Sequence, residues 1–166
     1  MGSRAMEYQI EIEEHEPQRY VTLEIECSPD EFEIEIEGAL TEVWTLLDVV
    51  GAPPAGPPLC LVPQIKGVED EVPPASPWRL RVGFPVEEEL EAEAPVFFGE
   101  LPGGRIATTV HEGKLDSLST AYLALQIYFQ AHDLQPNGMP WEVYLTDPVW
   151  EPDPEKWRTI VRWAVQ

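Results

Sequence analysis

The spacing of apolar residues changes in the same order twice along this chain, and that order limits the fold more than any other feature. In the first half, residues 7–14 and 19–27 alternate apolar and polar side chains, as half-buried strands do. The spacing becomes that of an amphipathic helix from Ile36 onward, and this helix is predicted to end at Gly51. Residues 59–65 and 78–86 are predicted as two further strands, with Pro63 placing the first of them at an edge or a bulge.

One stretch before this helix fits two structures. Ser28 followed by Pro29, Asp30 and Glu31 is typical of a helix start, because proline suits the first turn and acids favour the positive helix end. The next residues, EFEIEIE, alternate like a strand. The sequence leaves both structures open for them.

The second half repeats the order. Its four predicted strands are at residues 95–101, 105–111, 141–146 and 157–165. Between the second and the third of these strands a helix is expected, with Asp116 or Ser117 as its cap. The apolar stripe of this helix consists of Leu118, Tyr122, Leu125 and Phe129.

The two predicted helices begin about 80 residues apart, as do PPLCLV and MPWEVY, which indicates an internal duplication. The predicted fold is therefore α+β, with two pseudo-symmetric ββαββ repeats at about residues 7–90 and 94–166. They are expected to form two antiparallel sheets with two main helices on one side. A central cleft between the repeats is the expected place for a small-molecule site. Residues 1–5 are predicted to be a cloning remnant ahead of a single domain that starts near Met6.

Acidic residues outnumber basic ones by 31 to 10, which gives a net charge of −21. Because phosphate contacts need Lys and Arg, direct nucleic-acid binding is not expected, whereas cationic partners are favoured. No apolar run is long enough to span a membrane. Cys27 and Cys60 form no disulfide framework, so a reduced, cytoplasmic protein is expected. His15, His111 and His132 lack the spacing of metal ligands, and neither a metal nor a cofactor is expected.

The strand at residues 141–146 places Glu142 between apolar neighbours. Because successive side chains of a strand point to opposite faces, Trp141 and Val143 are predicted to face the core beneath the helices, and Glu142 and Tyr144 to face a pocket. A buried carboxylate without a partner gains most from a cation, and an aromatic neighbour adds roughly 0.5–2 kcal/mol of cation–π attraction. The alternative is a solvated glutamate, or one paired with an arginine of another strand, namely Arg79, Arg81 or Arg162.

Several short motifs follow one another in order: GFPV from Gly83, LPGG from Leu101, HEG from His111, AY from Ala121, WEVYLTDP from Trp141 and KWRTIVRWAV near the end. This series resembles the GyrI-like small-molecule-binding domain, which is also the effector-binding part of AraC-type and MerR-type regulators. The resemblance covers the chain from about residue 7. It implies a tandem pair of SHS2-like units with a pocket at their junction. It also implies that Glu142 is the buried glutamate that meets cationic aromatic ligands in this family.

The resemblance leaves three functions open. Members of the family are sensors fused to a DNA-binding domain or stand-alone domains; some of the latter bind DNA gyrase, and some hydrolyse cyclopropane-containing DNA-alkylating toxins. This chain has no room for a helix-turn-helix, so a stand-alone form is expected. We predict a multidrug sensor or sequestering module for lipophilic, cationic aromatic molecules rather than an enzyme. The alternatives are a hydrolase that uses Glu142, and a protein that binds DNA gyrase or a regulator through the thirteen acids of residues 7–42.

The predicted ligand-binding residues are Glu142, Tyr144, Trp157, Tyr122 and Trp44. A core position is the alternative for Tyr122 and Trp44, because both belong to helix stripes. Trp157 is placed on the last strand, beside the strand of Glu142.

Four other residues are assigned structural roles. Phe84 and Trp163 are predicted as core, and His111, which precedes a turn, as a structural histidine. Cys60 is the counterpart of Glu142 in the first half. A nucleophile–base pair of Cys60 with His111 lacks a third, orienting residue and is not favoured.

Overall fold

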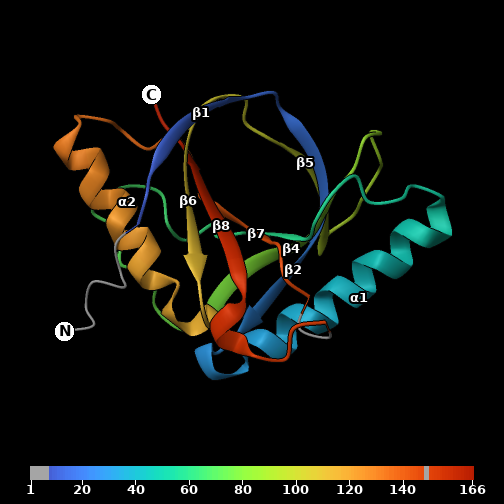
Figure 1. The fold of residues 1–166 in the computed structure, drawn as a ribbon. Helices are drawn as coiled ribbons and strands as arrows, with labels where there is room; N and C mark the ends of the chain where they lie inside the picture. The colour runs from blue at the N-terminus through green and yellow to red at the C-terminus, as the bar shows by residue number, and fades with distance from the viewer. Residues whose placement is uncertain (1–7, 148–149) are drawn as a thin grey trace.

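One antiparallel sheet organises the computed structural model, which describes residues 8–147 and 150–166. Within these residues eight strands lie in the order β1-β6-β8-β7-β3-β4-β2-β5 (Figure 1). The predicted cloning remnant at residues 1–5 lies outside the described residues. The strands are, in chain order, β1 (Glu11–His15), β2 (Gln18–Cys27), β3 (Leu59–Leu61), β4 (Trp78–Pro85), β5 (Val96–Leu101), β6 (Gly104–Glu112), β7 (Trp141–Tyr144) and β8 (Arg158–Ala164).

The sheet is symmetric about its centre. Each strand from β1 to β4 occupies the same place, counted from one edge, as its counterpart from β5 to β8 does, counted from the other edge. This is the arrangement of two ββαββ units joined through β3 and β7, which pair at the centre of the sheet. Each unit gives its first strand to the other, because β1 pairs with β6 and β5 pairs with β2. The predicted antiparallel α+β fold is confirmed, although the strands form one sheet instead of two. The boundaries of the two repeats stay a prediction.

Two short connections force this sheet to curl. β1 and β2 are six strand spacings apart in the sheet order, which would be about 29 Å if the sheet were flat. The link between them runs only from His15 to Gln18 and reaches about 10 Å when fully extended. The link from Leu101 to Gly104 sets the same limit for β5 and β6. The two edges of the sheet therefore approach each other where these two links lie. Figure 1 shows the strands curled with both helices outside the curl.

The first helix, α1 (Phe32–Val50), follows a 3-10 turn, η2 (Pro29–Glu31). The ambiguous stretch is helical: Phe32 and Ile36 are buried, whereas Ile34 between them is 75% exposed. Burial every fourth residue is the period of a helix and not of a strand. The helix ends as predicted at Gly51, whose φ of 75° lies in the left-handed region that glycine adopts at low cost.

The second helix, α2 (Ser119–Ala131), follows the 3-10 turn η3 (Leu115–Ser117). Its predicted stripe is buried in full. The predicted cap is wrong, because Leu118 occupies the cap position and the Ser117 hydroxyl donates to the Lys114 carbonyl instead. A last 3-10 turn, η4 (Pro154–Lys156), precedes β8. No helix among the described residues is both long and apolar enough to cross a membrane.

The central strands are shorter than predicted. β3 ends at Leu61, before Pro63, and lies in the middle of the sheet and not at an edge. Proline cannot donate a ladder hydrogen bond, so it ends the central strand and does not continue it. β7 likewise ends at Tyr144. Both central strands therefore present only a few side chains to each face.

The two faces of the sheet bury separate clusters of side chains. The outer face packs against the helices and includes Val82 and Trp163, both of them fully buried. The inner face of the curl carries Tyr20, Leu59, Leu61, Leu101, Ile106, Trp141, Val143 and Ala164. Core positions are confirmed for Trp163 and for Phe84, which is 7% exposed.

Candidate functional site

Glu142 lies in the middle of β7 and points to the face of the sheet that carries the helices. Its neighbours Trp141 and Val143 belong to the cluster inside the curl, so the predicted alternation is confirmed. The predicted assignment of the faces is wrong, because the side beneath the helices belongs to Glu142 and not to Trp141. The curl explains the difference: the inner face is also buried, and apolar residues are needed on both sides of this strand.

Two tyrosines hold the carboxylate of Glu142. Tyr122 of α2 donates its hydroxyl hydrogen to Oε2 at 2.5 Å, and Tyr144 of β7 donates to Oε1 at 2.7 Å. The alternative of an ion pair is not found among the described residues. Each of the three arginines considered for it contacts another glutamate: Arg79 contacts Glu26, Arg81 contacts Glu24 and Arg162 contacts Glu13.

The electrostatics of this group follow from its burial. Glu142 is 4% exposed. Loss of water raises the pKa of its carboxyl above the ordinary range, and the hydrogen bonds from Tyr122 and Tyr144 oppose that rise. Burial, reinforced by the nearby Glu142, holds the pKa values of both phenols well above normal, so they remain hydrogen-bond donors. The arrangement stabilises a carboxylate but supplies no positive charge.

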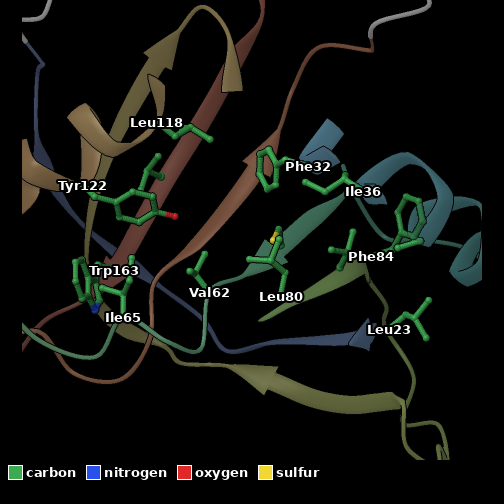
Figure 2. Close-up of a cluster of buried hydrophobic side chains, with 14 of the residues drawn as sticks. Leu23, Phe32, Ile36, Val62, Ile65, Leu80, Phe84, Leu118, Tyr122 and Trp163 are labelled. Atoms are coloured by element: carbon green, nitrogen blue, oxygen red, sulfur yellow. The ribbon is translucent and has the colours of Figure 1, made fainter. Parts of the chain in front are cut away.

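A cavity of about 240 Å³ opens in front of Glu142, between the N-terminal ends of the two helices. Tyr122 and Leu118 line it on the α2 side and Phe32 on the α1 side. Figure 2 shows the Tyr122 hydroxyl directed toward the space between these groups, with Leu80 and Val62 lying between the two sides. The remaining lining residues are mostly apolar: Pro29, Ile65, Pro73, Pro74, Ser76, Trp78, Leu115, Asp116 and Ser119.

The cavity draws on both halves of the chain, as a cleft between repeats requires. Phe32 and Leu80 come from the first half, and Tyr122 and Glu142 from the second. Cys60, from the first half, lies directly opposite Glu142 in the pairing of β3 with β7. Burial and the nearby Glu142 raise the pKa of the Cys60 thiol well above normal, so it stays protonated.

The predicted ligand-binding residues lie at different distances from this cavity. Glu142 and Tyr122 line it, and Tyr144 reaches it through its hydrogen bond to Glu142. Trp44 is 55% exposed on α1 and packs edge-on against Phe84, outside the cavity lining. Trp157 is also outside the lining. It ends the turn η4, and its indole nitrogen donates to the Glu151 carbonyl.

Two aromatic residues of the cavity wall were not anticipated from the sequence. Phe32 and Trp78 both line the cavity and pack edge to face with ring centroids 5.2 Å apart. The Trp78 indole donates to the Pro74 carbonyl, which fixes the ring at the cavity wall. Each of them looks like an ordinary core residue in the sequence. The alternation that puts Trp78 on the face of Leu80 and Val82 would have been the signal.

His111 is a structural residue, as predicted. It is 1% exposed, and its Nδ1 lies 2.8 Å from the Tyr8 hydroxyl. Its Nε2 lies 3.0 Å from the Lys114 carbonyl and 3.0 Å from the Ser117 hydroxyl. Cys60 is not among its partners, so the nucleophile–base pair is not formed. Among the described residues, no group of three or more His, Cys, Asp or Glu side chains is placed to hold a metal ion.

Comparisons with known proteins agree with this fold. The model of the GyrI-like small molecule binding domain matches residues 8–166. The C-terminal domain of EcmrR is similar in structure, with a TM-score of 0.76 and 18% identity over 96% of this chain and 98% of that domain. In the EcmrR–DNA complex the TM-score is 0.79 at 20% identity, and the match covers 98% of this chain but 59% of the EcmrR chain.

Two further structures share the fold at lower similarity. A hydrolase encoded by lin2189 from Listeria innocua has a TM-score of 0.58 and 13% identity, over 95% of this chain and 92% of that one. SAV2435 bound to tetraphenylphosphonium has a TM-score of 0.50 and 10% identity, over 96% of this chain and 94% of that one. No curated protein matches the sequence significantly.

Proposed function

The chain belongs to the family of GyrI-like small-molecule-binding domains, and we propose that its ligand is a small aromatic cation held by Glu142 in the cavity between the helices. The observation that carries the proposal is a buried carboxylate, bonded only to neutral hydroxyls among the described residues, in the wall of an apolar cavity. A carboxylate in such a place gains most from a ligand that brings a positive charge with it.

The shape and lining of the cavity support an aromatic ligand. Phe32, Trp78 and Tyr122 present three ring systems around it, and ring faces attract cations as well as apolar groups. Its volume of about 240 Å³ is below the roughly 300–1,000 Å³ of pockets for drug-sized ligands, so a small ring system fits best. The related structure of SAV2435 contains tetraphenylphosphonium, a lipophilic aromatic cation, which is consistent with this ligand class.

The test is a calorimetric titration with phenyltrimethylammonium and with its uncharged carbon isostere, tert-butylbenzene. Wild type should bind the cation saturably and at least about tenfold more tightly than the isostere, because only the cation pairs with Glu142. Glu142→Gln should abolish that preference. Glu100→Gln, which removes an exposed glutamate on β5, is the matched control and should leave it intact.

Tryptophan fluorescence locates the ligand. Trp78 lines the cavity, so binding should change its emission, and Trp78→Phe should remove that change while calorimetry still detects binding. Equal affinity for the cation and the isostere in the wild type would show that Glu142 does not select charge. The aromatic-cation assignment would then be abandoned.

Hydrolysis of a strained electrophile is the second candidate, because the same carboxylate lies in the wall of an apolar cavity and a related fold is that of a hydrolase. A general base must reach a water molecule within about 2.6–3.2 Å. Both oxygens of Glu142 already accept a tyrosine hydrogen bond, which favours binding over hydrolysis. Turnover of a cyclopropane electrophile by wild type, lost in Glu142→Gln, would reverse this order. Binding to DNA gyrase or to a regulator stays a prediction.

A further inference from the structure

A second cavity lies on the other face of β7. Its volume is about 460 Å³, compared with about 240 Å³ for the cavity at Glu142. Leu59, Trp141 and Val143 line it, and all three belong to the cluster inside the curl. Glu142 points to the opposite face, so one four-residue strand forms part of the wall of two separate cavities.

The architecture of the sheet builds this second cavity. The two short links that cause the curl also close one of its ends, because His15, Gln18, Leu101 and Pro102 belong to its lining. The links are in direct contact: a Cβ placed on Gly103 would lie 2.8 Å from Cδ of Pro17. The cavity therefore depends on the exchanged first strands, and the loop before β3 completes its lining with Ala55, Gly56 and Pro57.

One guanidinium in this cavity lacks a hydrogen-bond acceptor. Arg162 of β8 lines the cavity, and its Nε is buried with no partner among the described residues. Its ion-pair partner is Glu13, whose Oε1 is 3.8 Å away from the other end of the guanidinium. That oxygen lies within hydrogen-bond distance of the His15 ring at 2.8 Å and of the Thr108 hydroxyl at 3.3 Å. A buried donor left in this state costs free energy until an acceptor arrives.

Two other arginines on the strands make the hydrogen bond to a carboxylate that Arg162 lacks. Arg81 donates from its own Nε to Glu24 at 3.0 Å, and Arg79 lies 3.0 Å from Glu26. A protein with 31 acids and 10 bases has carboxylates available to pair each arginine in this way. The Arg162 guanidinium has no carboxylate within hydrogen-bond distance among the described residues, which leaves it available to an acceptor supplied by a ligand.

We propose that this second cavity binds a hydrophobic monocarboxylate, whose carboxylate pairs with the guanidinium of Arg162 while its apolar body packs on Leu59, Trp141 and Val143. Guanidinium and carboxylate match in geometry and form strong charge-assisted hydrogen bonds. Glu14 and Glu16 also line the cavity, and their charges disfavour any anion, a dianion such as phosphate more strongly than a monocarboxylate. The site is separate from that of the aromatic cation and does not depend on Glu142.

The direct test follows the arginine itself in the wild-type protein. With arginine labelled with nitrogen-15, the Nε–H resonance of Arg162 is assigned by its loss in Arg162→Lys. Addition of 4-(trifluoromethyl)benzoate should shift this resonance saturably and leave that of Arg158 unchanged. Arg158 lies on the same strand but is exposed, 3.7 Å from Glu112. A salt concentration of about 0.15 M screens the repulsion of an anion by the acidic surface.

Fluorine NMR of the same ligand measures the affinity. Arg162→Met should weaken binding by about tenfold or more, whereas Arg158→Met and Glu142→Gln should leave it unchanged. The methyl ester of the ligand, which keeps the apolar body but loses the charge, should bind much more weakly than the acid.

Four results would overturn the proposal. The first is an Arg162 resonance that does not move while the ligand binds, and the second is an ester that binds as tightly as the acid. The third is an equal loss in Arg158→Met, which would indicate general surface charge. The fourth is loss of binding in Glu142→Gln, which would place the ligand in the first cavity. Because the resonance is observed in wild type, a poorly folded Arg162→Met does not affect the first of these tests.

Discussion

Cys60 and Glu142 face each other directly across the paired central strands β3 and β7. The sheet order is symmetric about this pair, so the two residues occupy equivalent places in the two halves of the sheet. One half supplies a buried thiol and the other a buried carboxylate. The site therefore has one carboxylate at its centre and not two. A ligand with a single positive charge matches it best.

The asymmetry at this pair predicts the effect of introducing a second acid. Cys60→Asp would place two buried carboxylates opposite each other, and like charges in a water-poor site raise the cost of both. We expect the free energy of unfolding at pH 7 to fall by about 3 kcal/mol or more. Urea denaturation measures this change.

Two controls separate charge from packing in that experiment. Cys60→Ala removes the sulfur without adding a charge and should cost about 1 kcal/mol. Combining Cys60→Asp with Glu142→Gln leaves one acid in the site and should recover part of the lost stability. A double variant as unstable as Cys60→Asp alone would show that repulsion between the two carboxylates is not the cause.

Tyr122 and Tyr144 should contribute to stability through their hydrogen bonds to Glu142 as well as through the packing of their rings. Tyr122→Phe and Tyr144→Phe each remove one donor from the carboxylate, so each should lower the free energy of unfolding at pH 7 by about 1–3 kcal/mol. Each should also raise the pKa of Glu142 further, since the hydrogen bonds now oppose its rise. Tyr128→Phe is the control, because the Tyr128 ring stacks on His132. If Tyr122→Phe and Tyr144→Phe cost as much stability in a protein that already carries Glu142→Gln, the hydrogen bonds to the carboxylate are not the cause.

Stability and cation binding should respond to pH in opposite directions. The pKa of Glu142 is raised on folding above its ordinary 4.5, so the unfolded chain releases this proton first as the pH rises. The contribution of Glu142 to stability is thus complete below about pH 4.5, and it is lost as the pH rises through the folded pKa. The carboxylate that attracts a cation forms over the same interval, so affinity for phenyltrimethylammonium should rise there.

Wild type and Glu142→Gln, compared by urea denaturation and by calorimetry between pH 4 and pH 8, provide the measurement. The stability of wild type relative to the variant should fall with pH, and its affinity relative to the variant should rise. A flat difference in both quantities would mean that Glu142 does not titrate in this range.

The sequence was sufficient for most of the elements but not for their arrangement. Alternation identified β7 and the opposite directions of Trp141 and Glu142. It could not decide which face lies under the helices, because that depends on pairing between distant strands and on the curl. The segment before Ile36 satisfied both periods locally, and only packing of Phe32 against the sheet selects the helix.

The candidate site was predictable to the extent that its chemistry is unusual in the sequence. Glu142 stands out because a charge interrupts an apolar strand. Phe32 and Trp78 do not, because aromatic residues are common in cores and only the cavity distinguishes them. Trp44 is predicted to bind the ligand, with a core position as the alternative because it belongs to the apolar stripe of α1. That stripe is wider than the surface that the sheet covers, and Trp44 remains half exposed at its margin.

Gly83 is the position where the backbone of the sheet leaves no room for a side chain. It pairs with Thr22 of β2, and a Cβ at Gly83 would lie 1.9 Å from the Val21 carbonyl oxygen and 2.8 Å from Cα of Thr22. Because both obstacles are backbone atoms, no rotamer change relieves them. Gly83→Ala should therefore destabilise the fold by about 3 kcal/mol or more, measured by thermal or urea denaturation.

Gly38, in the exposed middle of α1, is the matched control for Gly83. A Cβ there meets no atom within 4 Å, and alanine favours a helix over glycine by roughly 0.5–1 kcal/mol. Gly38→Ala should therefore stabilise the protein by about that amount, so the same substitution has opposite signs at the two sites. If Gly83→Ala stabilises the protein as Gly38→Ala does, β2 and β4 can separate enough to admit a methyl group. The close approach of these strands, and not a general preference for glycine, is what the comparison tests.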